Sequence, residues 1–213
     1  MGAAVARALK ARGDHVVVSG RSATKTRSMA NELRTPGHCA DFASIDNVRR
    51  LAAELRDQHE GIDVLVNNAG LVVGPKRTLT ADGYELTFQV NHLAPFLLTM
   101  LQRAQLTSAN VVVVTTSSRA GAIRSARLDL DDMKMDHSYN ALAAHRASKL
   151  TNVLFIRELA RRWGPLGATA AAVHPGIVRS GWGTTGPAAV RLVVNSPSRL
   201  AMSSPERGAA TIV

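Results

Sequence analysis

A histidine and a lysine lie four residues apart in the stretch Asn140–Phe155, which otherwise has the composition of a single helix. Positions i and i+4 share one helix face, so His145 and Lys149 are expected to point the same way. Imidazole can transfer protons near neutral pH, and a neighbouring ammonium group lowers its pKa. A neutral His145 could accept a proton from an alcohol but would be a poor acid for carbonyl reduction. The alternative is a histidine left in an unused pocket.

The elements that would position this pair alternate along the chain. Strands are expected at His15–Gly20, Gly37–Phe42, Ile62–Gly70, Asn110–Ser118 and Ala168–Gly176, where β-branched or small residues run together. Helices are expected at Ala23–Leu33, Ile45–Gln58, Asp82–Gln102 and Ala141–Trp163. The strands lack polar alternation, so both faces of the sheet should be buried. This pattern predicts an α/β fold, a doubly wound parallel sheet of Rossmann-like type between helix layers.

Length and composition indicate one domain over residues 1–213, with 46% hydrophobic residues. The formal charge is +10, but the basic residues form no tract, so we expect no nucleic-acid partner. No apolar run is long enough to span a bilayer. The single cysteine, Cys39, fits a reducing cytoplasm. We expect no metal site.

The turn Asn67–Gly70, with the sequence NNAG, follows one of the buried strands. A doubly wound sheet binds dinucleotides at the carboxyl ends of its strands, and this turn lies at such an end. Small residues there, Ala69 and Gly70, would let the backbone approach a ribose or a nicotinamide. The turn therefore predicts cofactor binding, and the alternative is a tight turn without a ligand.

Five motifs occur in the order and at the spacings of the short-chain dehydrogenase/reductases. They are NNAG (Asn67–Gly70), NHLAPFLLT (Asn91–Thr99), VVVVTTSS (Val111–Ser118), SKLTNVLF (Ser148–Phe155) and HPGIV (His174–Val178). The chain resembles the retinol-dehydrogenase-like branch most, because it also has the LDLDDM insertion at Leu128–Met133. The resemblance covers nearly the whole chain.

This resemblance implies hydride transfer between a nicotinamide and an alcohol or carbonyl carbon. By position, the family's catalytic asparagine is Asn91, its serine is Ser118 and its lysine is Lys149, whereas its tyrosine is replaced by His145. Tyr139, six residues upstream, is the only nearby tyrosine. The cofactor-binding positions implied by the resemblance are Gly2, Arg21, Asp41, Asn67, Ala69, Gly70, Lys149, Pro175, Gly176 and Val178.

Arg21 follows the first expected strand, where an acidic residue would bind a ribose 2′-hydroxyl and an arginine suits a 2′-phosphate. It predicts NADP as the cofactor, with NADPH preferred over NADH; the alternative is an exposed arginine at a helix start. Asp41 resembles the family residue that contacts adenine, although it could instead help to cap the following helix.

Both ends of the chain depart from the family pattern. Gly2 matches the last glycine of the Gly-rich turn, and the preceding strand and the rest of that turn are absent. We therefore expect a fold truncated at both ends, with a gap in the sheet, lower stability and weak cofactor binding. Ser204 and Pro205 have the residue types of a helix start, and the chain ends before the family's last strand.

The leading hypothesis is an NADP-dependent oxidoreductase acting on a hydrophobic alcohol or carbonyl, as a monomer or a homodimer. The substrate would enter beneath a loop-rich, lid-like segment at Ile177–Ser203, where Trp182 could line the pocket. The alternative is a catalytically impaired paralogue that serves as a binding or regulatory protein, or a truncated gene product.

Overall fold

A computed structural model describes residues 1–106, 110–118, 126–179, 186–196 and 202–213. Trp182 and parts of the expected lid lie outside these ranges. The strands are β1 (Val18–Gly20), β2 (Gly37–Cys39), β3 (Val64–Asn67), β4 (Val112–Thr116) and β5 (Thr169–Val173). The helices are α1 (Gly2–Ala11), α2 (Ala23–Leu33), α3 (Ile45–Gln58), α4 (Leu86–Phe88), the π-helix η1 (Gln89–Leu93), α5 (Ala94–Leu101), α7 (Ala141–Trp163), the 3₁₀-helix η2 (Gly164–Leu166), α8 (Ala188–Asn195) and α9 (Pro205–Ala209).

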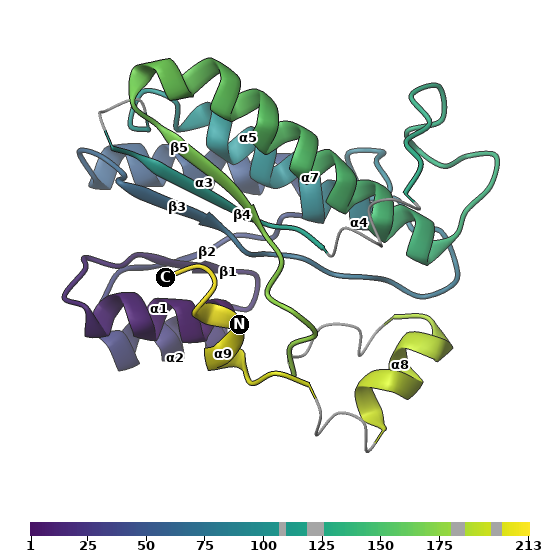
Figure 1. The fold of residues 1–213 in the computed structure, drawn as a ribbon, viewed down its shortest axis with the longest axis horizontal. Coiled ribbons are helices and arrows are strands. Elements are labelled where there is room, and N and C mark those ends of the chain that lie inside the picture. The colour runs from purple at the N-terminus through teal and green to yellow at the C-terminus, as the bar shows by residue number, and fades with distance from the viewer. Residues whose placement is uncertain (107–109, 119–125, 180–185, 197–201) are drawn as a thin grey trace.

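The strands form two parallel sheets in the described part of the chain (Figure 1). One pairs β1 with β2, and the other has the order β3-β4-β5. The expected gap is therefore present, because no ladder joins β1 to β3 within the described residues. Val64 on β3 is 45% exposed, in contrast to the buried Val113 and Val114 on the central strand β4.

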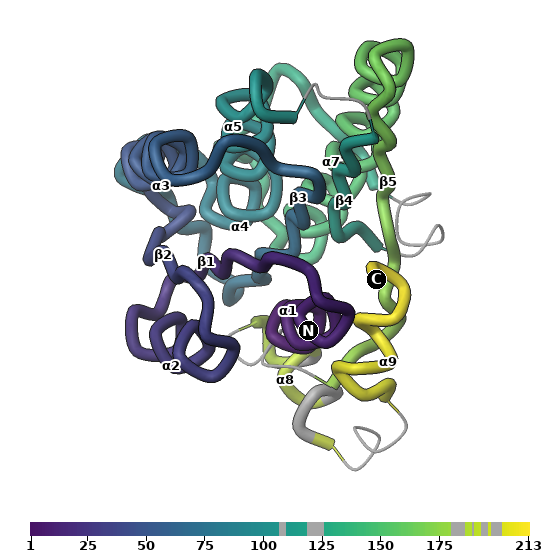
Figure 2. Tube along the Cα trace, turned by 90° about the vertical axis from the view of Figure 1, so that its left-hand side faces the viewer, coloured from purple at the N-terminus to yellow at the C-terminus, as the bar shows by residue number. Residues whose placement is uncertain are grey.

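Helices cover both faces of the strands (Figure 2). On one face, α7 packs against β4 and β5, and α3 packs against α5. On the other face lie α1, α2 and α9. Leu9 of α1 packs against the cluster Ala4, Val5 and Ala209, which Val66 of β3 also joins, and against the cluster Ala6, Val16 and Leu33, which Val18 of β1 joins. The two sheets are thus held together through helix packing, which gives the Rossmann-like α/β architecture expected from the sequence.

All five strands are shorter than expected, and two further expected elements differ from the structure. β1 begins at Val18 rather than His15, because its ladder partner β2 begins only at Gly37, opposite Val18. The helix expected at Asp82–Gln102 begins at Leu86 and passes through the π-helix η1. The segment Ile177–Ser203 is not only loop, since it contains the helix α8. None of the helices in the described ranges is long and apolar enough to cross a bilayer.

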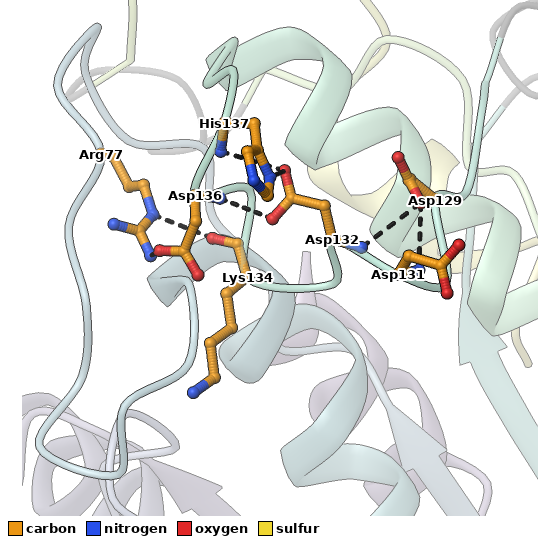
Figure 3. Close-up of polar contacts among 7 residues, drawn as sticks. All are labelled: Arg77, Asp129, Asp131, Asp132, Lys134, Asp136 and His137. Atoms are coloured by element: carbon orange, nitrogen blue, oxygen red, sulfur yellow. Dashed lines mark hydrogen bonds and ion pairs between the residues drawn. The ribbon is translucent and has the colours of Figure 1, made fainter.

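The insertion before α7 is held by side-chain contacts to its own backbone and to Arg77 (Figure 3). Asp129 Oδ1 accepts from the backbone N–H of Asp131 at 3.0 Å, and Asp132 Oδ1 accepts from that of Asp136 at 2.7 Å. Arg77 lies on the loop after β3; it pairs with Asp136 and donates to the carbonyl of Lys134 at 2.8 Å. These contacts fix the approach of the chain to the start of α7.

Candidate active site

Lys149 and His145 lie on the first half of α7, and the start of this helix is set by Asn140. The Asn140 side chain accepts from the backbone N–H groups of Leu142 and Ala143, both at 3.0 Å, so α7 begins at Ala141 as its N-cap residue dictates. Lys149 is 5% exposed, and its Nζ donates to the carbonyl of Thr116 at 2.9 Å. The end of β4 therefore holds the lysine ammonium group.

Asn91, on the π-helix η1, lies beside Ser148 and so connects this helix to the part of α7 that carries Lys149. Its Oδ1 accepts from the backbone N–H of Leu71 at 2.7 Å, while its Nδ2 donates to the Leu71 carbonyl at 2.9 Å and to Ser148 Oγ at 3.0 Å. His145 Nδ1 lies 3.5 Å from Asn91 Nδ2. A Cβ atom on Gly70 would lie 3.4 Å from both Asn91 Oδ1 and Lys149 Nζ. Four of the expected site residues thus converge: Gly70, Asn91, His145 and Lys149.

The two titratable groups of this cluster are both shifted towards their neutral forms. Burial lowers the pKa of Lys149 to about 8, from 10.5. Burial and then the charge of Lys149 lower the pKa of His145 to about 4, from 6.5, while a hydrogen bond to the backbone of Leu71 opposes this shift. His145 is therefore neutral at pH 7, as the sequence indicated, and more strongly so than a neighbouring lysine alone would cause.

Ser118 lies near Lys149, whereas Tyr139 lies near the start of α4. Ser118 is partly buried, two residues beyond Thr116, at the strand end where Lys149 is held. Tyr139 lies near Glu85 and Thr87 at the start of α4, and its hydroxyl has no well-aligned hydrogen bond in the described structure. Burial, followed by the charge of Glu85, raises the Tyr139 pKa to about 12, so it would be a weak proton donor.

The loop after β3 and the start of α1 offer features that suit a ribose or nicotinamide group. Gly2 lies so close to Asn68 that a Cβ there would come within 2.7 Å of Asn68 Nδ2. Asn68 Oδ1 is buried without a hydrogen-bond partner in the described structure. Gly70 and Ala69 are exposed. Among the described residues, the Thr116 carbonyl is the one hydrogen-bond partner of Lys149 Nζ, so the three-donor ammonium retains capacity for a ligand.

Asn67 occupies a more internal place than expected for a cofactor contact. Its side chain is buried, and Nδ2 donates to Thr99 Oγ1 at 3.1 Å and to Thr115 Oγ1 at 3.3 Å. These bonds tie β3 to β4 and α5. A cofactor contact through Asn67 stays a prediction, and the side-chain amide already has a structural role.

Arg21 and Asp41 lie just beyond the carboxyl ends of β1 and β2. Arg21 is exposed, and its guanidinium has no hydrogen bond or ion pair with the described residues. Asp41 Oδ1 accepts from the backbone N–H of Ala43 at 3.0 Å, whereas Ser44 is the N-cap of α3. Asp41 therefore shapes the turn before α3 without being its cap.

The expected residues after β5 form a turn that packs under α9. Gly176 has a φ of +81°, a conformation that glycine adopts without strain. Val178 pairs with Ser203 in an isolated bridge, and Arg179 N donates to the Ser203 carbonyl at 2.9 Å. A Cβ on Gly208 of α9 would lie 2.6 Å from Val178 Cγ2 and 3.5 Å from the Pro175 carbonyl. This packing fixes Pro175, Gly176 and Val178 beside the strand end.

The sequence interpretation missed several residues that hold Lys149. Ser117 Oγ donates to the Lys149 carbonyl at 2.9 Å, and Asn152 Nδ2 donates to the Thr116 carbonyl at 3.3 Å. Asn152 follows Lys149 by three positions, a spacing that shares one helix face and could have pointed to it. The role of the Thr116 carbonyl could not be read from the sequence, since every residue has a backbone carbonyl.

The comparisons with known proteins agree with this geometry. The family model described as enoyl-(acyl carrier protein) reductase matches residues 1–199. Human retinol dehydrogenase 13 is 38% identical over 181 residues, covering 81% of this chain and 54% of its own length. Human retinol dehydrogenase 12 is 37% identical over 188 residues, and the match covers 84% of this chain and 58% of the length of that protein. The chain belongs to the short-chain dehydrogenase/reductase family, in its retinol-dehydrogenase-like branch.

A solved structure of this family shares the whole fold. The short-chain dehydrogenase from Burkholderia cenocepacia J2315, in complex with NADP, superimposes with a TM-score of 0.73 at 25% sequence identity. The superposition covers 99% of this chain and 83% of the Burkholderia chain. The chain spans little more than half the length of the two retinol dehydrogenases, 54% and 58%.

Proposed function

We propose that the protein is an NADP-dependent oxidoreductase that oxidises a hydrophobic alcohol more readily than it reduces the matching carbonyl. The observation that carries this proposal is the convergence of Gly70, Asn91, His145 and Lys149 around one buried ammonium group. A nicotinamide supplies the hydride acceptor or donor when it is bound. The residues that would hold it are Lys149, Asn68 and the exposed Gly70, with Gly2 at the start of α1.

His145 sets the direction of proton transfer. With its pKa at about 4, the ring is neutral at pH 7, so it has few protons to give and would act as a base rather than as an acid. In alcohol oxidation the hydroxyl proton would pass to the imidazole as the carbonyl forms. A base with so low a pKa is weak, so we expect slow turnover.

The substrate class rests on exposed apolar side chains in the segment Ile177–Ser203. Ile177 is 66% exposed and Leu192 is 73% exposed, and both lie beyond the carboxyl end of β5. Burial of such side chains against a substrate would favour an apolar molecule. The cytoplasm, inferred from the single Cys39, and a monomeric or homodimeric state are part of the proposal.

A second candidate function is favoured by the same histidine. Because His145 stands where the family has its tyrosine, the chain could bind the dinucleotide without turning over a substrate. It would then be a catalytically impaired paralogue with a binding or regulatory role.

Calorimetric titration of the protein with NADPH and with NADH tests the proposal. We expect NADPH to bind at least about tenfold more tightly, because the exposed Arg21 can form a charge-assisted fork with a 2′-phosphate. Arg21→Glu should remove this preference, and Arg27→Glu, an exposed arginine on α2, is the matched control. Binding of neither nucleotide would exclude the enzyme function; binding without turnover of a panel of apolar alcohols would favour the second candidate.

A further inference from the structure

A second histidine lies near Lys149 and is not among the site residues expected from the sequence. His92 follows Asn91 on the π-helix η1, and its Nδ1 lies 3.0 Å from Asn152 Oδ1. The ring sits among three phenylalanines, with centroids 5.3 Å from Phe88, 6.1 Å from Phe96 and 6.3 Å from Phe155. An amide oxygen only accepts hydrogen bonds, so the proton of a neutral His92 must be on Nδ1.

Asn152 is 1% exposed and all of its hydrogen-bonding groups are engaged. Its Nδ2 donates to the carbonyl of Asn91 at 3.0 Å and to the carbonyl of Thr116 at 3.3 Å. Two carbonyls on one side and a ring N–H on the other admit only one orientation of the amide. A flipped amide would place its oxygen against both carbonyl oxygens.

The two carbonyls that accept from Asn152, those of Thr116 and Asn91, belong to the residues that hold the candidate active site together. Thr116 O is the acceptor of Lys149 Nζ, so the lysine and Asn152 share one oxygen atom. Asn91 O belongs to the residue whose side chain orders Leu71 and Ser148. Four residues after Asn91 comes Pro95, which has no N–H and cannot make the usual helical bond to this carbonyl. Asn152 supplies a donor in its place.

We propose that His92 and Asn152 form a positioning pair for Lys149: His92 fixes the Asn152 amide, and the amide ties the π-helix to the Thr116 carbonyl that holds the lysine. Neither residue needs to touch substrate or cofactor for this role. The inference deepens the proposed function, on which its catalytic meaning rests, but the pair itself acts in the protein without any ligand.

The geometry predicts how the loss of His92 or of Asn152 would change the pKa of Lys149. Without the Asn152 donor, the Thr116 carbonyl is free to accept more strongly from the ammonium, and the contact between α7 and β4 loosens and admits water. Both effects favour the charged lysine, so its pKa should rise. His92 acts one step further away, so its loss should have a smaller effect in the same direction.

The test measures the pH dependence of amine acetylation at Lys149 by peptide mass spectrometry, in the protein without nucleotide. The exposed Lys25 in the same sample is the internal reference. The titration midpoint of Lys149 should rise by about half a pH unit or more in His92→Phe and further in Asn152→Leu. Phenylalanine suits the aromatic surroundings of His92, so this variant should keep its fold even if Asn152→Leu does not.

Two controls separate positioning from general loosening. In His92→Asn the new amide nitrogen can replace Nδ1 as a donor, so the midpoint should return towards that of the unaltered protein. Thr151→Val removes a buried hydroxyl next to Asn152 that bonds only within α7, to the carbonyls of Ala147 and Ser148, and should leave the midpoint in place. The proposal is overturned if His92→Phe leaves the midpoint unchanged, if His92→Asn behaves like His92→Phe, or if Thr151→Val causes the same rise.

The result is independent of nucleotide binding. If NADPH fails to bind while the midpoint moves as expected, the proposed function fails and the positioning pair stands. If NADPH binds and the midpoint does not move, the proposed function stands and the pair is rejected.

Discussion

At the scale of single residues, the site combines a buried lysine with a histidine that is hard to protonate. Both shifts have burial as their largest cause, and the charge of Lys149 lowers the His145 pKa further. The Thr116 carbonyl compensates only one donor of the lysine. The arrangement favours taking up a proton over donating one.

Replacing His145 by tyrosine should raise the rate of carbonyl reduction. A phenol beside the Lys149 ammonium can donate a proton at pH 7, and a positioned acid contributes about a hundredfold or more. The measurement is steady-state NADPH oxidation with an apolar ketone or aldehyde. Lys149→Ala in the same background is the control and should remove the gain. An unchanged rate, in a variant that still binds NADPH, would show that the remaining site is not intact.

At the scale of elements, helix starts are set locally and strand limits are not. Ser22, Ser44 and Asn140 each accept backbone N–H groups at the first turn of α2, α3 and α7, and these helices begin and end as expected from the sequence. Strand β1 is shorter than its apolar run, and in the described part of the chain it pairs with β2 alone. The π-helix η1 could not be foreseen, since its register depends on packing against α7.

Asn140→Ala tests the start of the helix that carries the site. Two backbone N–H groups would lose their acceptor, so the free energy of unfolding should fall by about 1 kcal/mol in urea titrations. Asn31→Ala on the exposed face of α2 is the matched control and should change it by less than about 0.5 kcal/mol. Equal losses in the two variants would contradict a capping role for Asn140.

At the scale of the whole molecule, the sheet is divided, and helices bridge the division. Leu9 of α1 packs against two apolar clusters, one that Val66 of the larger sheet also joins and one that Val18 of the smaller sheet joins. Val17 and Ala40, beside the smaller sheet, pack with α3 and α5. The open edge of β3 leaves Val64 exposed, while β4 has a neighbour on each side. Stability should therefore be uneven across the strands.

Hydrogen exchange can measure this unevenness. The backbone amides of β4 should exchange at least about tenfold more slowly than those of β3, because opening β4 disrupts two ladders and opening β3 disrupts one. Exchange of peptides covering Val112–Thr116 and Val64–Asn67, followed by mass spectrometry, gives the comparison. Equal protection would mean that the β3 edge is covered in solution, for example by a second copy.

Acid should destabilise the molecule through its buried histidines. The pKa of His145 is about 4 in the folded chain and near 6.5 when unfolded, so the unfolded state takes up its proton first as pH falls. The contribution of neutral His145 is present above pH 6.5 and is lost as pH falls towards 4. This should cost about 2 kcal/mol between pH 7 and pH 5. Burial also lowers the pKa of His92 and of His59, which act in the same direction.

Urea unfolding at pH 7 and pH 5 measures the contribution of His145 to the loss of stability in acid, when the natural chain is compared with His145→Gln. Glutamine does not titrate, so the variant should lose less stability on acidification. Parallel pH dependence in the two proteins would refute the assignment to His145.

The sequence by itself determined the order of the strands, the parallel α/β class, the family and the limits of α2, α3 and α7, because these follow from apolar periodicity, N-cap residues and motifs that are local in the chain. It also indicated the neutral His145, since i and i+4 share a helix face. Only the tertiary structure decided that Asn67 is an internal tie, that Tyr139 packs against α4, and that His92 and Asn152 reach the lysine through the Thr116 carbonyl. Those facts depend on backbone groups and packing between elements distant in sequence, and residue types alone do not encode them.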